Sequence, residues 1–556
     1  YLLSASTRGA LSDYFIKYKG YNQTITATAT KQVKKFNFRL MVGSMWQDYE
    51  TDAYSVYGTQ LKDSANRYYH SGDSSNIGLV GSRLAQNYFG LPNMTINRQI
   101  AYFGEFSVSY NNLVYLSYTE RFESSSVFPK ENRNYNYPGF SLSAILSDIV
   151  PSIKGKFLNY LKLRASRAQT ARTAPPYSNQ AVFVNNYASS PIPVYSYGYT
   201  NNNPNLQPEM QKTFETGLEA RLLNDRISFE ASYYNTHNLN QISVQYRASY
   251  ATGYILNTQN AAETRNQGIE ATLGINPIRK KDFSWDINFN FNHMWSNVIG
   301  LPASLGPTTD YYISDTWVYA NVRGGLLRNH STTLLTGFDY ARNNNGQILI
   351  NATTGLPIVN QKFVPIGDRN PKFMLGTLNN FRYKNWTLNF LWDLKVGGDV
   401  WNGTEEYLTY IGKSDMTKDR MTARVVKGVL KDGNENSANP TVNTISVTPF
   451  ANNNYYSETL GMPDAAFIQK NINYLRLRDI TLSYNLPQNL IHKIRVVKSL
   501  SIFFTGNDLV LITNYRGADP SVSANTAGSM GISGFGMDYG NVATPVSYNF
   551  GLRANF

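Results

Sequence analysis

Strict alternation of apolar and polar residues constrains the fold of this chain more than any other sequence feature. It is clearest in residues 546–556, where six apolar residues alternate with Ser, Asn, Gly, Arg and Asn. A period of two places the apolar side chains on one face of a β-strand. That face meets either the core of a soluble sandwich or the lipid around an outer-membrane barrel, and the terminal aromatic residue favours the barrel. We predict that this strand carries a C-terminal assembly signal formed by Tyr548, Phe550, Leu552 and Phe556.

The same pattern recurs along the whole chain. In residues 283–295 the odd positions carry large aromatic or apolar side chains, together with His293, and the even positions up to 292 carry Ser, Asp or Asn. Short connections at 111–112, 223–225, 277–282 and 384–385 alternate with long ones near 48–97, 171–210, 238–264, 297–370, 399–471 and 513–545. Short turns on one side and long loops on the other are typical of outer-membrane barrels. We therefore predict an all-β, transmembrane antiparallel β-barrel portion of about 16 strands.

In the strand predicted around 475–484, the apolar residues change from odd to even positions. Leu475 and Leu477 occupy odd positions, whereas Ile480, Leu482 and Tyr484 occupy even ones. Such a slip near Asp479 predicts a β-bulge.

Composition excludes several other classes of protein. The 556 residues include 14% aromatic and 16% charged residues and no cysteine, so neither a disulfide framework nor a thiolate metal site can form. The formal net charge of +13 comes from scattered Lys and Arg without a dense basic run, which argues against nucleic acid as a partner. A wet lumen or anionic lipid head groups account for this charge equally well.

Several sequence blocks resemble the SusC/RagA family of TonB-dependent transporters. The resemblance is carried in order by 161–170, 205–209, 224–227, 266–270, 367–372, 397–399, 473–487, 500–509 and 514–520, which cover essentially the whole chain. The block 473–487 reads Asn-Tyr-Leu-Arg-Leu-Arg-Asp-Ile-Thr-Leu-Ser-Tyr-Asn-Leu-Pro, and 514–520 reads Asn-Tyr-Arg-Gly-Ala-Asp-Pro. The block at 161–170 departs from the family pattern at Arg167, and Ala171-Arg172 after it replace the usual Gly-Asn.

The resemblance implies a large plugged barrel of about 22 strands, of which residues 1–556 would form the C-terminal part, with the N-terminal plug and first strands missing. It implies a TonB-energised importer of oligosaccharides or oligopeptides in the outer membrane, in contact with outer-membrane lipid. A SusD-like surface lipoprotein would be its partner, TonB would act through the missing N-terminal region, and the two-protein complex could dimerise. A complete passive porin of about 16 strands is the alternative within the same fold class. The residues do not decide between glycan and peptide cargo; the resemblance slightly favours glycans, the commonest cargo of the family.

Catalytic and metal sites leave no trace in the sequence. The five histidines are far apart, and the loop from Asp432 departs from a calcium loop because Ser437 replaces the required Gly. We therefore expect no cofactor, no metal and no enzymatic activity. Two other classes stay open: an outer-membrane lipase or protease, which needs a nucleophile and a base converging in space, and a soluble carbohydrate-binding β-protein.

Aromatic residues crowd three of the expected outer loops. Such side chains can stack on sugar rings or hold peptide side chains, and they can equally pack loop on loop or contact a partner subunit. The candidates for contact with a ligand or lid are Tyr195, Tyr197, Tyr199, Tyr311, Tyr312, Trp317, Tyr319 and Trp401.

Overall fold

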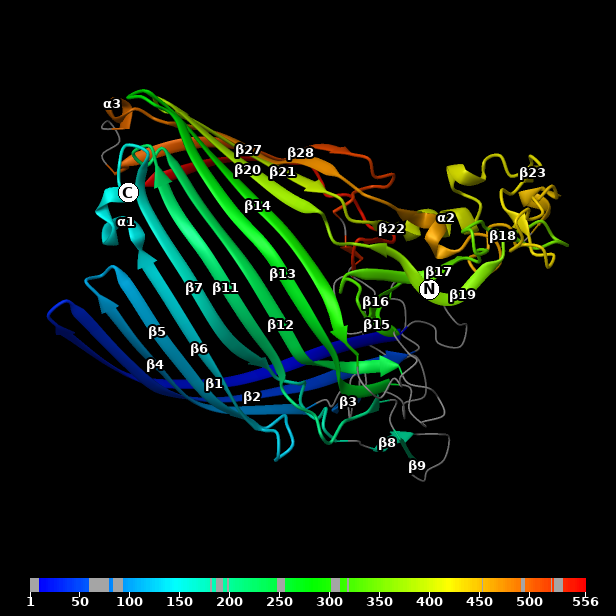
Figure 1. Ribbon diagram of the computed structural model, residues 1–556, viewed down its shortest axis with the longest axis horizontal. Coiled ribbons are helices and arrows are strands. Elements are labelled where there is room, and N and C mark those ends of the chain that lie inside the picture. Colours follow the sequence, from blue (N-terminus) through cyan, green and yellow to red (C-terminus); the bar gives the residue numbers. More distant parts are fainter. Residues whose placement is uncertain are drawn as a thin grey trace. The chain divides into compact units, whose positions relative to one another are not determined.

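The computed structural model is built mainly of long β-strands joined in antiparallel order (Figure 1). It describes residues 10–59, 80–83, 94–180, 183–186, 194–197, 200–247, 256–301, 311–317, 320–452, 454–491, 496–521, 523–524 and 534–556. The chain divides into two compact units. Unit 1 comprises Tyr1–Ser141, Arg167–Lys212 and Asn238–Ala262, and unit 2 comprises Leu142–Ser166, Thr213–His237 and Glu263–Phe556.

Unit 1 is organised by an antiparallel ladder of four long strands. They follow one another as β1 (Ala10–Val33), β2 (Phe36–Thr59), β4 (Met94–Tyr110) and β5 (Val114–Ser125). β3 (Val80–Arg83) pairs with the end of β2, and β8 (Phe183–Asn186) pairs with β9 (Val194–Tyr197). Asn111 and Asn112 both have positive φ, 51° and 58°, as a two-residue turn between right-handed twisted strands requires.

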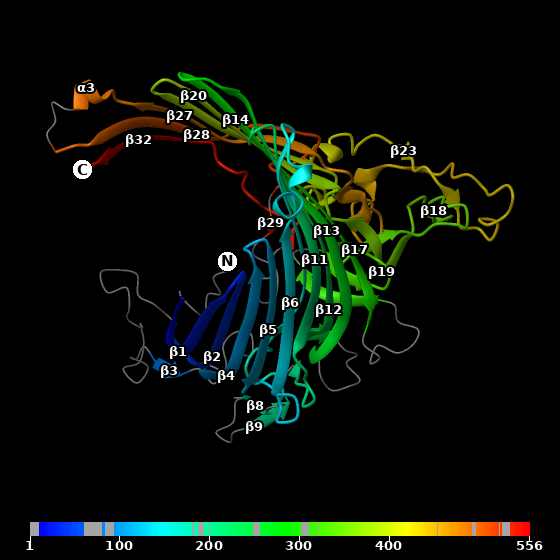
Figure 2. The same cartoon turned by 60° about the vertical axis from the view of Figure 1, so that its left-hand side comes forward.

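Unit 2 contains a second ladder of seven antiparallel strands. They are β13 (Leu256–Arg279), β14 (Phe283–Gly300), β20 (Phe373–Tyr383), β21 (Trp386–Val396), β27 (Tyr474–Asn485), β28 (Ser499–Thr513) and β32 (Ser547–Asn555). Figure 2 shows β14, β20, β27, β28 and β32 within this one sheet. The strands β6 (Asn134–Ile145), β7 (Leu158–Arg172), β11 (Glu209–Leu222) and β12 (Ile227–Arg247), like β13, have residues in both units.

The longest connections of unit 2 fold into a lobe with its own core. We call residues 320–368 and 399–472 the outer lobe. It contains β16 (Arg323–Leu327), β17 (Leu334–Tyr340), β19 (Val359–Asp368), β22 (Val400–Asn402), α2 (Gly403–Tyr410), β26 (Ile468–Gln469) and the 3-10 helices η5 (Asp415–Thr417) and η7 (Asp464–Phe467). β15 (Tyr311–Trp317) pairs with β16, and β31 (Met537–Asp538) pairs with β22. Its buried core consists of Val322, Leu335, Ile366, Trp401, Phe467 and Ile468, with Met537.

The remaining elements are short. They are β10 (Thr200–Asn201), β18 (Leu349–Ile350) paired with β24 (Val429–Leu430), β23 (Arg424–Val425) paired with β25 (Ser446–Val447), β29 (Ser523–Ala524) paired with β30 (Gly534–Phe535), α1 (Leu146–Ile149), α3 (Gln488–Ile491), η2 (Pro151–Ile153) and η6 (Pro449–Ala451).

The structure confirms the predicted turns and the bulge, but some loops are shorter than predicted. In the described residues the main sheet has 17 strands, and 15 remain once the short β3 and β10 are set aside, close to the predicted 16. The loops expected at 48–97 and 238–264 are shorter than predicted, because β2 continues to Thr59 and β12 and β13 reach Arg247 and Leu256. The extensions of β2 and β13 carry polar residues on both faces, so the period-two signal disappears although the strands continue, whereas residues 241–247 of β12 still alternate.

The bulge lies at Arg478, where pairing with both β21 and β28 shifts register between Leu477 and Asp479. It keeps the apolar residues of both halves of β27 on one face: Leu475 lies opposite Leu394, and Ile480 lies opposite Phe390. The phase slip in the sequence is therefore the signature of this bulge.

Candidate functional site

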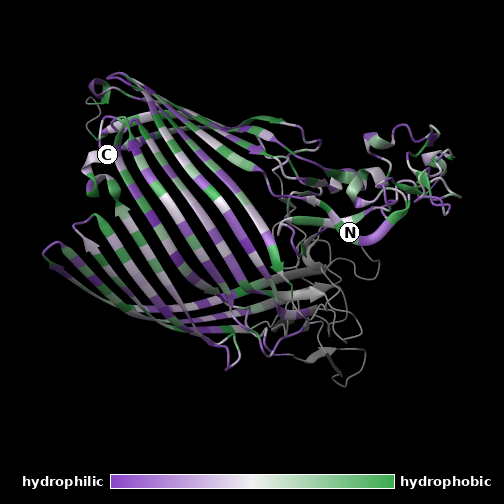
Figure 3. Ribbon diagram, in the orientation of Figure 1, coloured by the Kyte–Doolittle hydropathy of each residue, from purple (hydrophilic) through white to green (hydrophobic). Residues whose placement is uncertain are grey.

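One face of the unit 2 ladder is apolar and carries aromatic side chains at both ends. Next to the short turns, Trp285 stacks on Phe381 at 5.1 Å between ring centroids. At the other end Trp295 lies 5.0 Å from His293 and donates a hydrogen bond to Gln267. The ten residue steps from Trp285 to Trp295 span about 34 Å along the strand, or about 25 Å across a bilayer at a tilt near 40°. This height matches the apolar band of an outer-membrane barrel, and Figure 3 shows the alternating stripes.

In the described residues, no helix has the length and apolar character needed to cross a membrane.

The opposite face of the strands is polar and rich in ion pairs. In unit 1, Arg39 contacts Glu105 at 2.8 Å and Arg121 contacts Glu123 at 2.8 Å, while Arg39 alternates with the apolar Phe38 and Leu40. Such pairs on an accessible face are worth little stability, at most about 1 kcal/mol each. Their consequence is a wettable surface suited to a polar cargo or to another polar part of the protein.

The predicted assembly signal lies on the last strand of the unit 2 ladder. Phe550 lies opposite Phe504 and Leu552 opposite Ile502, and Tyr548 stacks on Phe504 at 6.1 Å. All four signal residues are strongly exposed, from 64% for Leu552 to 72% for Phe550 and Phe556. The geometry presents one apolar row, and recognition of this row by an assembly machinery stays a prediction.

The predicted ligand-contacting aromatic residues are distributed over three places. Tyr195 and Tyr197 lie on β9, and Tyr311, Tyr312 and Trp317 lie on β15 at the edge of a four-stranded sheet. Tyr199 and Tyr319 lie outside the described residues. Whether these residues contact a ligand stays a prediction.

Trp401 is not the exposed aromatic that the sequence suggested. Its exposed fraction is 0%, and it packs in the core of the outer lobe with Leu335 and Met537. Its indole N–H donates a 2.7 Å hydrogen bond to Glu406 Oε2. No sequence pattern indicates this burial, because the contacting residues come from segments more than 60 positions apart. Of the two roles considered for these aromatic residues, ligand contact and packing within the loops, Trp401 has the second.

A buried pair of carboxyl groups, which the sequence did not reveal, lies beneath Trp401. Glu406 on α2 and Asp464 on η7 are 4% and 0% exposed. Asp464 accepts backbone hydrogen bonds from Phe338 at 2.7 Å and Asn321 at 3.2 Å. Burial, and then the nearby Asp464, raise the pKa of Glu406 well above its ordinary value. Burial also raises the pKa of Asp464 to about 6, despite these two hydrogen bonds.

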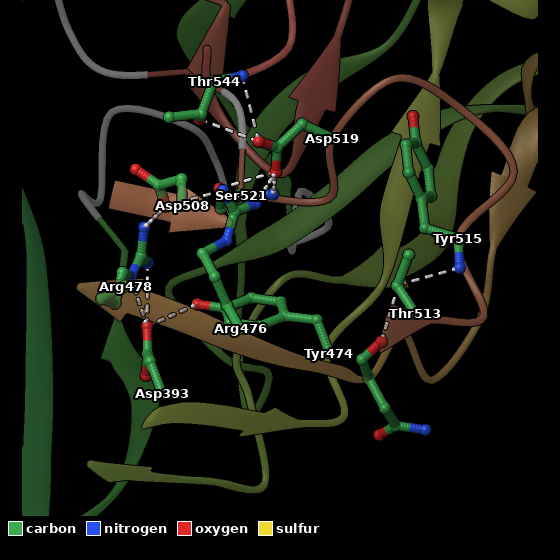
Figure 4. A network of polar contacts seen from close by, with 11 residues as sticks. Asp393, Tyr474, Arg476, Arg478, Asp508, Thr513, Tyr515, Asp519, Ser521 and Thr544 are labelled. Atoms are coloured by element: carbon green, nitrogen blue, oxygen red, sulfur yellow. Dashed lines mark hydrogen bonds and ion pairs between the residues drawn. The ribbon is translucent and has the colours of Figure 1, made fainter. Parts of the chain in front are cut away.

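A second buried network is built from the C-terminal sequence blocks (Figure 4). Arg476 Nη2 lies 2.5 Å from Asp519, and its Nη1 lies 3.2 Å from Asp508. Asp519 also accepts from Ser521 and Thr544, with Thr544 Oγ1 at 2.8 Å. Arg478, in the bulge, binds Asp393 at 2.8 Å. The network fastens the connection between β28 and β32 onto the polar face of β27.

Electrostatics explains why Asp519 tolerates its burial. Burial alone would raise the pKa of this carboxyl group, but the Arg476 guanidinium and the donors of Ser521 and Thr544 hold the pKa well below its usual range. Asp519 is thus a permanent anion matched by a buried cation. Arg476, Asp508 and Asp519 come from the three separate blocks 473–487, 500–509 and 514–520, and the fold brings these blocks into one contact network.

In the described part of the chain, no group of three or more His, Asp or Glu residues is placed to hold a metal ion. The loop at Asp432 binds its own backbone: Asp432 accepts from the Asn434 N–H at 2.9 Å, and Glu435 accepts from the Gly433 N–H at 2.7 Å.

Comparison with known proteins gives a consistent picture. A family model described as TonB dependent receptor-like β-barrel matches residues 3–297. The chain is 24% identical over 586 residues to TonB-dependent receptor P26 of Formosa agariphila, covering 100% of this chain and 54% of the relative. It is 25% identical over 453 residues to TonB-dependent receptor SusC of Bacteroides thetaiotaomicron, covering 77% and 42%. The chain thus spans about half the length of the curated relatives it matches.

Among solved structures, the RagAB peptide importer in the closed-closed state superimposes with a TM-score of 0.74 at 17% identity. The match covers 98% of this chain and 56% of that chain. At this level of identity the likeness is one of fold.

Proposed function

The chain belongs to the family of TonB-dependent receptor-like β-barrels of the outer membrane, and we propose that it is the C-terminal wall and outer rim of a SusC/RagA-type nutrient importer. In this proposal residues 1–556 supply wall strands and most outer loops, and the plug and first strands belong to a preceding region. The observation that carries the proposal is the family match, together with similarity to SusC over 77% of the chain. The relatives are receptors and transporters, which speaks against an enzyme.

The outer lobe supports a partner on the cell surface. Its exposed side chains include large apolar ones, notably Tyr410 at 62%, Met421 at 68%, Val442 at 67% and Phe450 at 64%. Exposed apolar groups of this size mark interaction sites when they gather on one region. We infer that a SusD-like lipoprotein covers the lobe, captures the cargo and closes over it, while TonB acts on the plug.

The polar face of the wall suits a hydrophilic cargo. Ion pairs such as Arg39–Glu105 and Arg164–Glu230 leave this face charged but internally neutralised, so it repels neither a neutral glycan nor a peptide of mixed sequence. Of the similar proteins, RagAB is a peptide importer, and SusC is named only as a receptor. We propose oligosaccharides or oligopeptides as cargo, without a preference from the wall itself.

Native mass spectrometry of the detergent-extracted complex from its own membrane tests this proposal. We expect a second, lid-sized lipoprotein and a small bound species, whose fragmentation identifies it as glycan or peptide. A Met421→Asp, Phe450→Asp double variant should lose the second protein, and Lys431→Asp in the same lobe is the control. A chain found alone or as a simple trimer, with no partner, would refute the importer in favour of a passive porin.

A further inference from the structure

An acidic side chain lies on the apolar face of the unit 1 ladder. Directly opposed residues of antiparallel strands share a face. Glu120 on β5 lies opposite Gly104 on β4, between the pairs Phe106–Tyr118 and Tyr102–Phe122. Gly104 in turn lies opposite Val42. Glu120 is therefore surrounded by the side chains that face lipid, whereas the ion-paired Arg121 and Glu123 lie on the polar face.

The depth of Glu120 places it inside the apolar band. It is six residues beyond Val114, the first residue after the short turn, which corresponds to about 16 Å across the bilayer at a tilt near 40°. The apolar band is about 25 Å tall, so Glu120 lies in its outer half. Ionisable side chains at this depth are unfavourable and mark functional sites.

Glu120 is held by two side chains of its own face. Asn136 Nδ2 donates a 2.9 Å hydrogen bond to Oε1, and the Tyr118 hydroxyl donates to Oε2. A carboxylate offers about four acceptor positions, so two donors leave further positions open toward the membrane. These positions need N–H or O–H donors, which acyl chains lack.

A cavity of about 340 Å³ is lined by Asn136, the amide partner of Glu120; Glu120 itself is not one of its lining residues. Ile100, Tyr102 and Phe122 form an apolar wall, and Ser124, Asn134 and Asn136 supply hydroxyl and amide groups. All six share the lipid-facing side of β4, β5 and β6. The two other described lining residues are Glu123 and Tyr135, so neither Lys nor Arg is among the described residues that line the cavity.

We propose that this groove binds an outer-leaflet glycolipid, with acyl chains along the apolar wall and amide N–H or hydroxyl donors of its head end toward Glu120 and the two asparagines. The charge of the groove supports this ligand. A lipid recognised through phosphate alone would meet a carboxylate and no cation, whereas the amide and hydroxyl groups of a glycolipid complement the open acceptors. The inference depends on the outer-membrane location and not on the cargo of the importer.

Lipid analysis by native mass spectrometry of the full-length transporter tests the groove. The wild-type protein should retain glycolipid through delipidation in mild detergent, and Glu120→Leu should retain at least about fivefold less. Phe140→Leu lies on the same apolar face but outside the groove and should retain the wild-type amount. If Glu120→Leu fails to insert, judged by heat-modifiable mobility, Asn136→Leu takes its place with the same expected loss.

Three results would overturn the proposal. Equal glycolipid retention by Glu120→Leu and wild type would show that the carboxylate is not involved. Preferential retention of an aminophospholipid would identify an ammonium ligand instead. A crosslink from a cysteine placed at Tyr102 to a second copy of the chain would show that protein covers the groove. Loss of lipid with unchanged cargo uptake would separate this site from the transport proposal.

Discussion

Glu406→Gln should remove the loss of outer-lobe stability that we expect at high pH. Glu406 Oε2 accepts from Trp401, and no hydrogen bond from a described residue reaches the buried Oε1. Both oxygens of Asp464 already accept backbone N–H groups. The arrangement is satisfied when Glu406 carries the proton and donates it to Asp464. A glutamine amide is similar in shape and supplies a permanent N–H donor in its place.

The magnitude follows from the Asp464 pKa. Raising a carboxyl pKa from 3.8 to about 6 corresponds to about 3 kcal/mol, shared by the coupled pair. A raised carboxyl pKa means that the contact is fully favourable below the unfolded pKa near 4. Asp464 loses its proton first, near pH 6, and the contribution of the proton on Glu406 is lost as pH rises further through the raised pKa of Glu406. At a pH above the raised pKa of Glu406 the substitution should therefore stabilise the lobe by about 1–3 kcal/mol, and near pH 4.5 it should change little.

Other charged groups on the packed elements do not replace this proton. Glu458 adds negative potential to both members of the pair. Glu405 on α2 accepts from Ser414, and Asp538 on β31 accepts a 2.6 Å hydrogen bond from the Tyr515 hydroxyl. Neither Glu406 nor Asp464 forms an ion pair with a described Lys, Arg or His. Rising pH therefore adds an uncompensated charge to the lobe.

Hydrogen exchange measured by mass spectrometry on the purified full-length transporter reports the stability of the outer lobe around Glu406 and Asp464. After correction for intrinsic exchange, peptides covering 403–410 and 464–467 should lose protection in the wild type between pH 5 and a pH above the raised pKa of Glu406. They should keep it in Glu406→Gln. Glu405→Gln, the neighbouring carboxylate outside the pair, is the control and should follow the wild type. Equal protection of the wild-type peptides at both pH values would refute the shared proton.

Three further variants test two buried contacts and the proposed assembly signal. Arg476→Met should destabilise the connection between β28 and β32 by about 3–5 kcal/mol, since it leaves Asp519 buried and unpaired. Limited proteolysis within 514–546 measures this loss of stability. The control is Arg98→Met: the Arg98 side chain is 60% exposed and pairs with Asp48 near the surface, so its removal should cost less than about 1 kcal/mol. Trp401→Ala should lower the stability of the outer lobe by about 3–5 kcal/mol, measured by exchange in 403–410, without reducing outer-membrane levels. Phe550→Ala with Phe556→Ala should reduce insertion, seen as loss of heat-modifiable mobility, and normal levels would contradict the assembly signal.

The wall of this protein could be read from the sequence because its pattern is local. The strands alternate, several short turns carry residues such as Asn111 and Lys384 that adopt positive φ, and the bulge at Arg478 appears as a change of phase. The end of β13 was missed because polar residues occupy both of its faces. Residues 241–247 of β12 do alternate, so the loop predicted there was too long although the sequence carried the strand pattern.

The outer lobe could not be read in this way, because its contacts join distant segments. Trp401 meets Val322, Ile366 and Met537, and no spacing in the sequence relates these four residues. The Glu406–Asp464 pair joins a helix to a 3-10 helix nearly sixty residues away. Aromatic residues in a loop therefore indicate either a ligand or a core, and only the fold separates the two.

The wall is specified by local alternation and the outer lobe by contacts between distant segments, and this difference suggests how an importer of the proposed kind can change its cargo. The wall depends on a pattern that lipid imposes on each strand separately, whereas the outer lobe is stabilised by its own core and carries the loops. The connection between β28 and β32, whose strand β31 pairs with β22 of the lobe, is joined to the wall through Arg476 and Asp519. Substitutions that reshape the lobe surface leave both the lipid face and this junction intact, so binding can diversify without loss of insertion. Substitutions at Arg476, in contrast, affect the junction itself and should be tolerated only when Asp519 changes with it.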